Sequence, residues 1–134
     1  MLFAMHATKL VVRDVAAAER FYCALGHKLV SRNTGGEGDV LQEQAWLSAS
    51  GDMASHVLIL TRFLELPLPE RPTYPGEIWL CFQVPDVDAS IAAVEANGGS
   101  CRRAGEDIPG HGVRAAVVCD NEGHVIELVG PMRG

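Results

Sequence analysis

Apolar positions along the chain follow a strand-like spacing in some segments and a helix-like spacing in others. This pattern predicts a series of short strands and helices. Strand-like apolar runs occupy 10–12 and 78–84. Asp14 can cap a helix after the first run, and Asp86 or Asp88 can cap one after the second. One helix is predicted from Val15 to about Leu25 and a second from about Ala89 to Ala96, with glycine closely after both. The chain is therefore expected to contain a strand followed by a helix at two places.

Further apolar segments rich in β-branched residues follow each predicted helix, and they predict the remaining strands. The expected strands lie near 28–33, 42–48 and 56–60 after the first helix, and near 100–104, 112–119 and 124–129 after the second. Each half of the chain is thus predicted to run strand, helix, strand, strand, strand, which is an α+β arrangement.

The two halves carry the same residues at corresponding positions, which indicates an internal repeat. A shift of 72 positions superposes six identical pairs, namely Val12, Asp14, Val15, Ala17, Ala24 and Gly26 on Val84, Asp86, Val87, Ala89, Ala96 and Gly98. A second shift, of 68 positions, aligns His56–Leu60 with His124–Leu128. The repeat predicts two tandem βαβββ units within one structural domain.

The segment between the two halves has a different composition, because 62–76 holds four of the seven prolines. Clustered prolines are typical of a stiff connector and not of a helix or strand. We therefore predict a first βαβββ unit over 1–61, a proline-rich connector over 62–76 and a second βαβββ unit over 77–132.

Composition and charge limit the classes of protein to which the chain can belong. Of the 134 residues, 48% are hydrophobic, which is enough to build a buried core. The net charge of −6 argues against nucleic acid, because phosphate binding needs a basic face. No apolar stretch is long enough to span a bilayer, and the first residues lack the basic start of a signal peptide. A soluble cytoplasmic protein is expected, with no nucleic acid and no membrane among its partners.

The four cysteines form neither a C-x-x-C pair nor a zinc-finger spacing. Cys81 and Cys119 lie in apolar runs, so reduced and buried thiols are expected.

Three groups of residues together resemble the vicinal oxygen chelate superfamily, which includes glyoxalase I, extradiol dioxygenases, methylmalonyl-CoA epimerase and the bleomycin-resistance proteins. They are Val12-Arg-Asp-Val15 with Phe21-Tyr22 and Leu25-Gly26, Val84-Pro-Asp-Val-Asp88 with Gly98-Gly99, and Asp120 to Leu128. The resemblance covers nearly the whole chain. It implies a glyoxalase-like fold, in which the two units form half-barrels around a shared cavity, and it implies a homodimer.

The resemblance also implies a metal. Enzymes of the superfamily hold a divalent ion with His and Glu or Gln from the first and last strand of each unit, and the ion chelates two neighbouring substrate oxygens. Glu127 falls on the last of these positions, within an otherwise apolar strand. A buried carboxylate needs a partner, so Glu127 is the candidate metal ligand and catalytic residue.

The other three ligand positions lack a donor in an ungapped alignment. Ile59 stands at the position equivalent to Glu127, and the spacing to V-x-D puts Ala7 and Trp79 at the remaining two. A β-bulge or a shift of register would bring His6 and Glu77 towards these positions instead.

Three functions are compatible with these residues, and one of them is a metal-free enzyme in which Glu127 alone acts as the general base. In the first of the other two, His6, Glu77 and Glu127 bind Fe, Mn, Ni or Zn in an enzyme of lyase, isomerase or dioxygenase type that acts on a small oxygenated substrate. In the second, no metal is bound, and the chain is a small-molecule-binding protein of the bleomycin-resistance type whose acidic groups attract a cationic compound.

Three residues are expected to line the substrate or ligand pocket. Trp79 offers an aromatic wall, and Ile59 takes the place of Glu127 in the first half of the repeat. His111 lies in the loop Pro-Gly-His-Gly, where it either covers the site or is simply a solvated loop residue.

Overall fold

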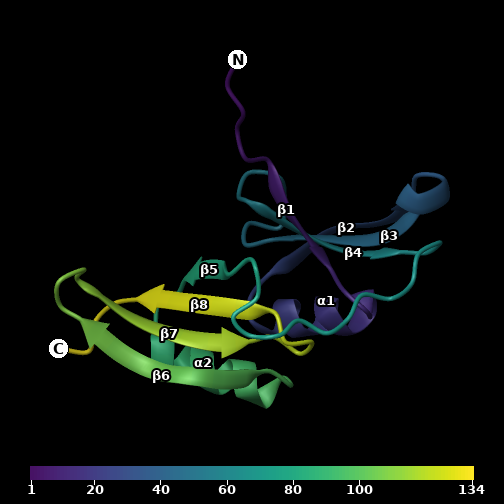
Figure 1. The fold of residues 1–134 in the computed structure, drawn as a ribbon. Coiled ribbons are helices and arrows are strands. Elements are labelled where there is room, and N and C mark those ends of the chain that lie inside the picture. Colours follow the sequence, from purple (N-terminus) through teal and green to yellow (C-terminus); the bar gives the residue numbers. More distant parts are fainter. The chain divides into compact units, whose positions relative to one another are not determined.

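Two βαβββ units follow one another along the chain (Figure 1). The computed structural model describes all residues from 1 to 134, and it divides into the units 1–70 and 71–134. The division falls inside the segment 62–76 that the sequence predicts as a connector. The α+β class and the order of elements in each unit confirm the predicted βαβββ repeat.

The first unit contains a four-stranded sheet in the order β1-β4-β3-β2. Strand β1 runs parallel to β4, and the other neighbours are antiparallel. Its elements are β1 (Ala7–Val11), α1 (Val15–Ala24), β2 (Lys28–Gly35), a short 3₁₀ helix (Gly38–Val40), β3 (Gln42–Ser48) and β4 (Val57–Phe63).

The second unit repeats this arrangement with the order β5-β8-β7-β6, and β5 is again parallel to β8. Its elements are β5 (Leu80–Gln83), α2 (Val87–Ala96), β6 (Ser100–Ile108), β7 (Val113–Cys119) and β8 (Val125–Gly130).

An aspartate fixes the start of each helix. The side chains of Asp14 and Asp86 each accept a hydrogen bond, at 3.0 Å, from the backbone amide three residues further on. The second helix begins at Val87, earlier than predicted, because Asp86 and not Asp88 is the cap. No helix in the structure combines the length and the apolar character that a membrane span requires.

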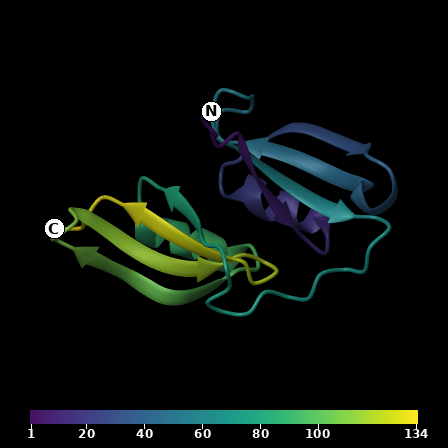
Figure 2. The same cartoon turned by 45° about the horizontal axis from the view of Figure 1, so that its top comes forward.

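Each helix packs against one face of its own sheet (Figure 2). In the second unit a Cβ at Gly130 would lie 3.1 Å from Val87 Cγ2, so Gly130 on β8 faces α2. Alternation along the strand then puts Leu128 on the helix side, and Val125 and Glu127 on the other side.

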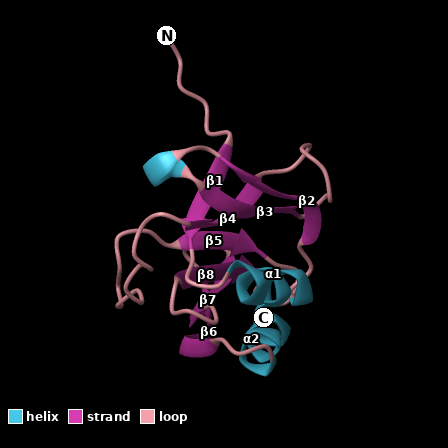
Figure 3. Ribbon diagram, turned by 90° about the vertical axis from the view of Figure 1, so that its right-hand side faces the viewer, coloured by secondary structure: helices cyan, strands magenta, loops and turns pink.

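We call this other side the helix-free face of the second unit (Figure 3). It comprises, from the strand registers, Cys81 on β5, Val117 on β7, and Val125, Glu127 and Val129 on β8.

The first unit is divided in the same way. Arg32 on β2 pairs with Glu19 of α1, which places Arg32 on the helix side. Its neighbours in the sheet, Ala45 and Leu60, are fully buried there, where α1 packs against β3 and β4. Each unit therefore has its own apolar core between helix and sheet.

Most predicted strands are found within a few residues of their expected positions, and two of the differences have a cause in the structure. Strand β6 continues to Ile108 instead of 104, because its pairing with β7 resumes beyond an irregular stretch. Strand β5 starts at Leu80 instead of 78. Trp79 precedes it, and its indole Nε1 donates a hydrogen bond to Pro75 O at 2.8 Å instead of taking part in the sheet.

Candidate functional site

Glu127 stands on the helix-free face with apolar neighbours. Strand β8 is paired on both sides, so the residues directly beside Glu127 are Cys81 and Val117. Val117 is 7% exposed, and Val125, two residues before Glu127 on the same face, is 3% exposed. Glu127 itself keeps an intermediate exposure. The carboxylate therefore rises from an apolar floor and is accessible to a ligand.

Cys81 is the polar neighbour of Glu127. Its Sγ donates a hydrogen bond to Glu127 Oε1 at 3.7 Å. Burial and, next, the Glu127 carboxylate hold the pKa of the Cys81 thiol above its ordinary value, so the thiol is protonated at neutral pH. All four cysteines are free, as expected. The expectation of a buried thiol is wrong for Cys81, which is exposed at the sheet edge, and Cys119 is only partly buried.

This geometry predicts a slow reaction of Cys81 with iodoacetamide, because the thiolate is the nucleophile and the raised pKa keeps it scarce. We expect the alkylation rate of Cys81 to rise at a higher pH than the alkylation rate of an unperturbed cysteine does. Glu127→Gln should move this rise to lower pH, since it removes the neighbouring charge. Peptide-resolved mass spectrometry measures the rate for each cysteine separately, and Cys23, far from Glu127 in the sequence, is the internal control. An unchanged profile of Cys81 in Glu127→Gln would contradict the contact.

Two aromatic rings contact each other in the segment that leads into β5. The ring centroids of Tyr74 and Trp79 are 5.8 Å apart, and the planes are tilted by 39°. The guanidinium carbon of Arg102 lies 3.5 Å from the Tyr74 ring centroid, which is a cation–π contact. Tyr74 and Trp79 remain 37% and 38% exposed. The rings are held by their neighbours and still offer a surface for stacking.

The turn between β7 and β8 is held by one buried carboxylate. Asp120 Oδ1 accepts hydrogen bonds from the backbone amides of Glu122, Gly123 and His124 at 2.9, 3.0 and 2.9 Å. Asp120 Oδ2 lies 2.8 Å from His124 Nδ1. Asp120 is 4% exposed. These bonds fix the start of β8 and thereby the position of Glu127.

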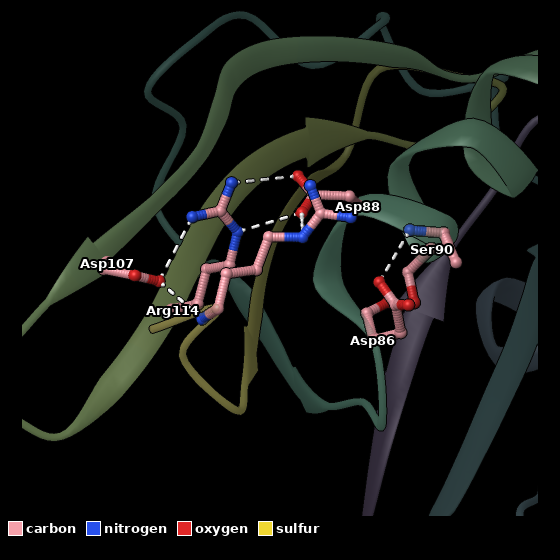
Figure 4. A network of polar contacts seen from close by, with 7 residues as sticks. Asp86, Asp88, Ser90, Asp107 and Arg114 are labelled. Carbon is pink, nitrogen blue, oxygen red and sulfur yellow. Dashed lines mark hydrogen bonds and ion pairs between the residues drawn. The ribbon is translucent and has the colours of Figure 1, made fainter.

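A second polar cluster lies on the helix side of this unit (Figure 4). Arg114 Nε donates to Asp88 Oδ2 at 3.0 Å, and Arg114 Nη1 donates to Asp107 Oδ1 at 3.1 Å. Arg133 forms a further ion pair with Asp88 at 3.0 Å. Two arginines thus balance two aspartates, and the cluster fastens α2 to the sheet.

A cavity of about 380 Å³ lies in the first unit, beside the first residues of α1 and strands β2 and β3. Its charged side chains include Glu19 and Arg32, which pair with each other at 2.6 Å. No residue predicted for the metal site or the pocket lines this cavity.

Comparison of the sequence with known protein families agrees with the strand order, the repeat and the single carboxylate of β8. A sequence model of the Glyoxalase/Bleomycin resistance protein/Dioxygenase superfamily matches residues 4–128. The chain belongs to this superfamily. The protein YaeR of Escherichia coli (strain K12) is 30% identical to it over 102 residues, which cover 72% of this chain and 73% of YaeR.

Solved structures of the superfamily share the fold. A glyoxalase family protein from Bacillus cereus superposes with a TM-score of 0.81 at 22% identity, covering 97% of this chain and 95% of that one. The fosfomycin resistance protein FosX from Mesorhizobium loti gives 0.66 at 16% identity, over 99% and 95%. A glyoxalase I mutant from Zea mays gives 0.75 at 26% identity, over 91% of this chain and 44% of the maize chain.

The positions implied as metal ligands by the superfamily resemblance hold few donors in this chain. In the first unit they are Ala7 and Ile59, and neither side chain has a donor atom. In the second unit they are Trp79 and Glu127, of which only the carboxylate is a metal ligand. Neither unit contains three or more His, Cys, Asp or Glu side chains grouped to hold an ion. These residues do not fit the metal of the superfamily enzymes.

The alternative donors are not moved into those positions within either unit. Strand β1 pairs with β4 from Ala7 to Val11 without a shift of register, so these pairs contain no bulge that would redirect His6. His6 is an exposed residue of the first unit. Glu77 is exposed in the second unit, in a bend three residues before β5. Neither unit alone therefore contains all three of His6, Glu77 and Glu127.

The three predicted pocket residues are divided between the two units. Trp79 belongs to the second unit, where it directly precedes β5 and contacts Tyr74. Ile59 belongs to the first unit, where Lys9 is its neighbour on β1. His111 is exposed in the turn between β6 and β7, and its amide donates to Ile108 O at 2.9 Å. That turn lies at the opposite end of β7 from the turn at Asp120.

Proposed function

We propose that this chain is a metal-independent small-molecule-binding protein of the superfamily, and that its ligand binds at Glu127. One observation carries the proposal: Glu127 is an accessible carboxylate on an apolar floor, and two partly exposed aromatic rings lie in the segment that leads into the neighbouring strand β5. Such a combination of an apolar surface and a few fixed polar groups is typical of ligand sites. The missing donors at Ala7, Ile59 and Trp79 support binding without a metal.

The roles of the individual groups follow from their chemistry. The Glu127 carboxylate accepts hydrogen bonds and attracts a cation, and Cys81 occupies only its Oε1 atom. Trp79 and Tyr74 offer their faces to a flat or cationic group. Val117 and Val125 supply the apolar contact beneath the ligand. A small organic molecule with a hydrogen-bond donor or a positive charge satisfies all of these groups.

The proposal is tested by a panel of cationic, neutral and anionic aromatic compounds, with Trp79 fluorescence as the signal. Trp46→Phe leaves Trp79 as the sole tryptophan, because the chain has two. At least one compound is expected to saturate the signal and to bind about tenfold more weakly to Glu127→Gln. Glu95→Gln is the matched control, since it removes the same charge from α2 on the other side of the sheet. A panel without any binder that depends on Glu127 contradicts the proposal.

Elemental analysis of the protein, purified without a chelator, separates this proposal from the metal-dependent lyase, isomerase or dioxygenase that the resemblance implies. Stoichiometric Fe, Mn, Ni or Zn that is retained in Glu95→Gln and lost in Glu127→Gln would replace the proposal with the metal enzyme. The homodimer and the cytoplasmic location stay predictions.

A further inference from the structure

A bulge in β6 brings two arginines onto the helix-free face. Cys101 is paired with Val118 and Arg103 with Val117, so Arg102 is an extra residue between two consecutive partners. Val117 lies on the helix-free face, and Arg103 opposite it therefore faces the same way. In such a bulge the extra residue and its successor both oppose one residue of the partner strand. Arg102 contacts the ring of Tyr74, in the segment that leads into β5.

The two arginines differ in what they contact. Arg103 has a carboxylate near it, Glu106 at 4.0 Å, and both side chains are well exposed. Arg102 has the Tyr74 ring against it instead of a carboxylate. The charge of Arg102 is therefore oriented by an aromatic ring but is not neutralised by an acidic side chain.

The carboxylate and the arginines lie at the two ends of one row across the sheet. Glu127 on β8, Val117 on β7 and Arg103 on β6 are successive partners. Two steps between neighbouring strands place the two end positions about 10 Å apart. Val117 lies between them and is nearly buried. An acidic end, an apolar middle and a basic end thus follow each other along this row.

The aromatic rings border the same row. Tyr74 contacts Arg102 at the basic end, and Trp79 precedes the strand that carries Cys81 at the acidic end. The pair of rings therefore reaches from one end of the row to the other. A flat molecule lying along the row would contact the rings on one side and Val117 beneath.

From this geometry we propose that the helix-free face recognises an amphoteric aromatic compound. Its cationic nitrogen pairs with Glu127, its flat body rests on Val117 beside Trp79, and its anionic group pairs with Arg102. The inference rests on the proposed function and adds the ligand class. A compound with only one of the two charges leaves either the carboxylate or the guanidinium without a partner, which lowers its affinity.

Three compounds with the same ring provide the test: para-aminomethylbenzoate with both charges, benzylamine with the cation only, and benzoate with the anion only. Each is titrated at neutral pH into the Trp46→Phe protein, and Trp79 fluorescence is recorded. We expect para-aminomethylbenzoate to bind about tenfold more tightly than either of the others. Arg102→Gln should reduce its affinity to that of benzylamine, and Glu127→Gln should reduce it to that of benzoate. Arg20→Gln, which removes a charge from α1, should leave all affinities unchanged.

The outcomes separate the inference from the proposed function. If benzylamine binds in a Glu127-dependent manner and the added carboxylate brings no gain, the amphoteric ligand is overturned and binding at Glu127 stands. If para-aminomethylbenzoate does not bind saturably, the amphoteric ligand is likewise overturned, and the compound panel decides about Glu127. If no compound of the panel depends on Glu127, both fall.

Discussion

Asp120→Ala is expected to lower the midpoint of thermal unfolding by about 10 °C. The Asp120 carboxylate is nearly buried and accepts three backbone hydrogen bonds within the turn before β8. Its removal leaves three amides and the His124 side chain without this partner. Buried donors without an acceptor are costly, and we expect a loss of about 3 kcal/mol in the free energy of unfolding. Circular dichroism during heating measures the change.

Two control variants make this result specific to the turn. Asp120→Asn keeps an acceptor oxygen for the amides and loses only the charge, so it should unfold between the wild type and Asp120→Ala. Asp39→Ala removes an exposed carboxylate from the short 3₁₀ helix, and it should leave the midpoint nearly unchanged. A midpoint of Asp120→Ala equal to that of Asp39→Ala would mean that water replaces the carboxylate at no cost.

The role of Asp120 also shows that a sequence motif can stabilise the fold as well as form a site. The segment Asp120 to Leu128 carries the family resemblance, and Glu127 within it is the candidate ligand position. The structure shows that the first residues of the segment hold the turn together, with His124 paired to Asp120 and 14% exposed in its side chain. Part of the motif therefore serves the fold, and only its strand presents a group to a ligand.

The elements could be predicted because local signals define them. Asp14 and Asp86 accept the first backbone amides of the helices, and glycines with positive φ follow both helices, at Gly26 and Gly98. The repeat then adds the sheet order, because two copies of one unit fold alike. The start of β5 could not be predicted in this way, since the bond from the Trp79 indole to Pro75 depends on the path of the connector.

The candidate site could be predicted only in part, because most of it depends on pairing between strands. Glu127 is visible as a single carboxylate in an apolar strand. Cys81 has a weaker signal, since it lies two residues after Trp79 and therefore on the same face of an extended chain. Tyr74 and Arg102 have none, because their contact joins the connector to a bulge, and a bulge follows from register that the sequence does not display.

The candidate metal ligands depend on strand pairing in the same way. The spacing to V-x-D identifies Ala7 and Trp79 as the relevant positions, and a bulge would have exchanged Ala7 for His6. The continuous register between β1 and β4 leaves His6 outside the strand. The pairing of β1 thus adds to the donors missing at Ile59 and Trp79, and together they support a site without the metal.

Gly130→Ala is expected to destabilise the chain by about 2 to 3 kcal/mol, because the position has no room for a methyl group. A Cβ at Gly130 would lie 2.6 Å from Val84 O and 3.1 Å from Val87 Cγ2. Val84 O is a backbone atom. The amide of Val84 donates a hydrogen bond to Val129 O at 2.8 Å, so this segment cannot move away without losing a hydrogen bond to β8. The start of α2 would have to shift to make room for the added methyl group.

Urea denaturation, followed by fluorescence, measures this loss. Gly110→Ala is the matched control, because a Cβ at Gly110 meets no atom within 4 Å. It should change the free energy of unfolding by less than about 0.5 kcal/mol. Equal stability of the two variants would show that α2 moves away from β8 at little cost. The helix side of the sheet would then be less tightly packed than these contacts indicate, and the position of β8, and with it Glu127, would depend mainly on the Asp120 turn.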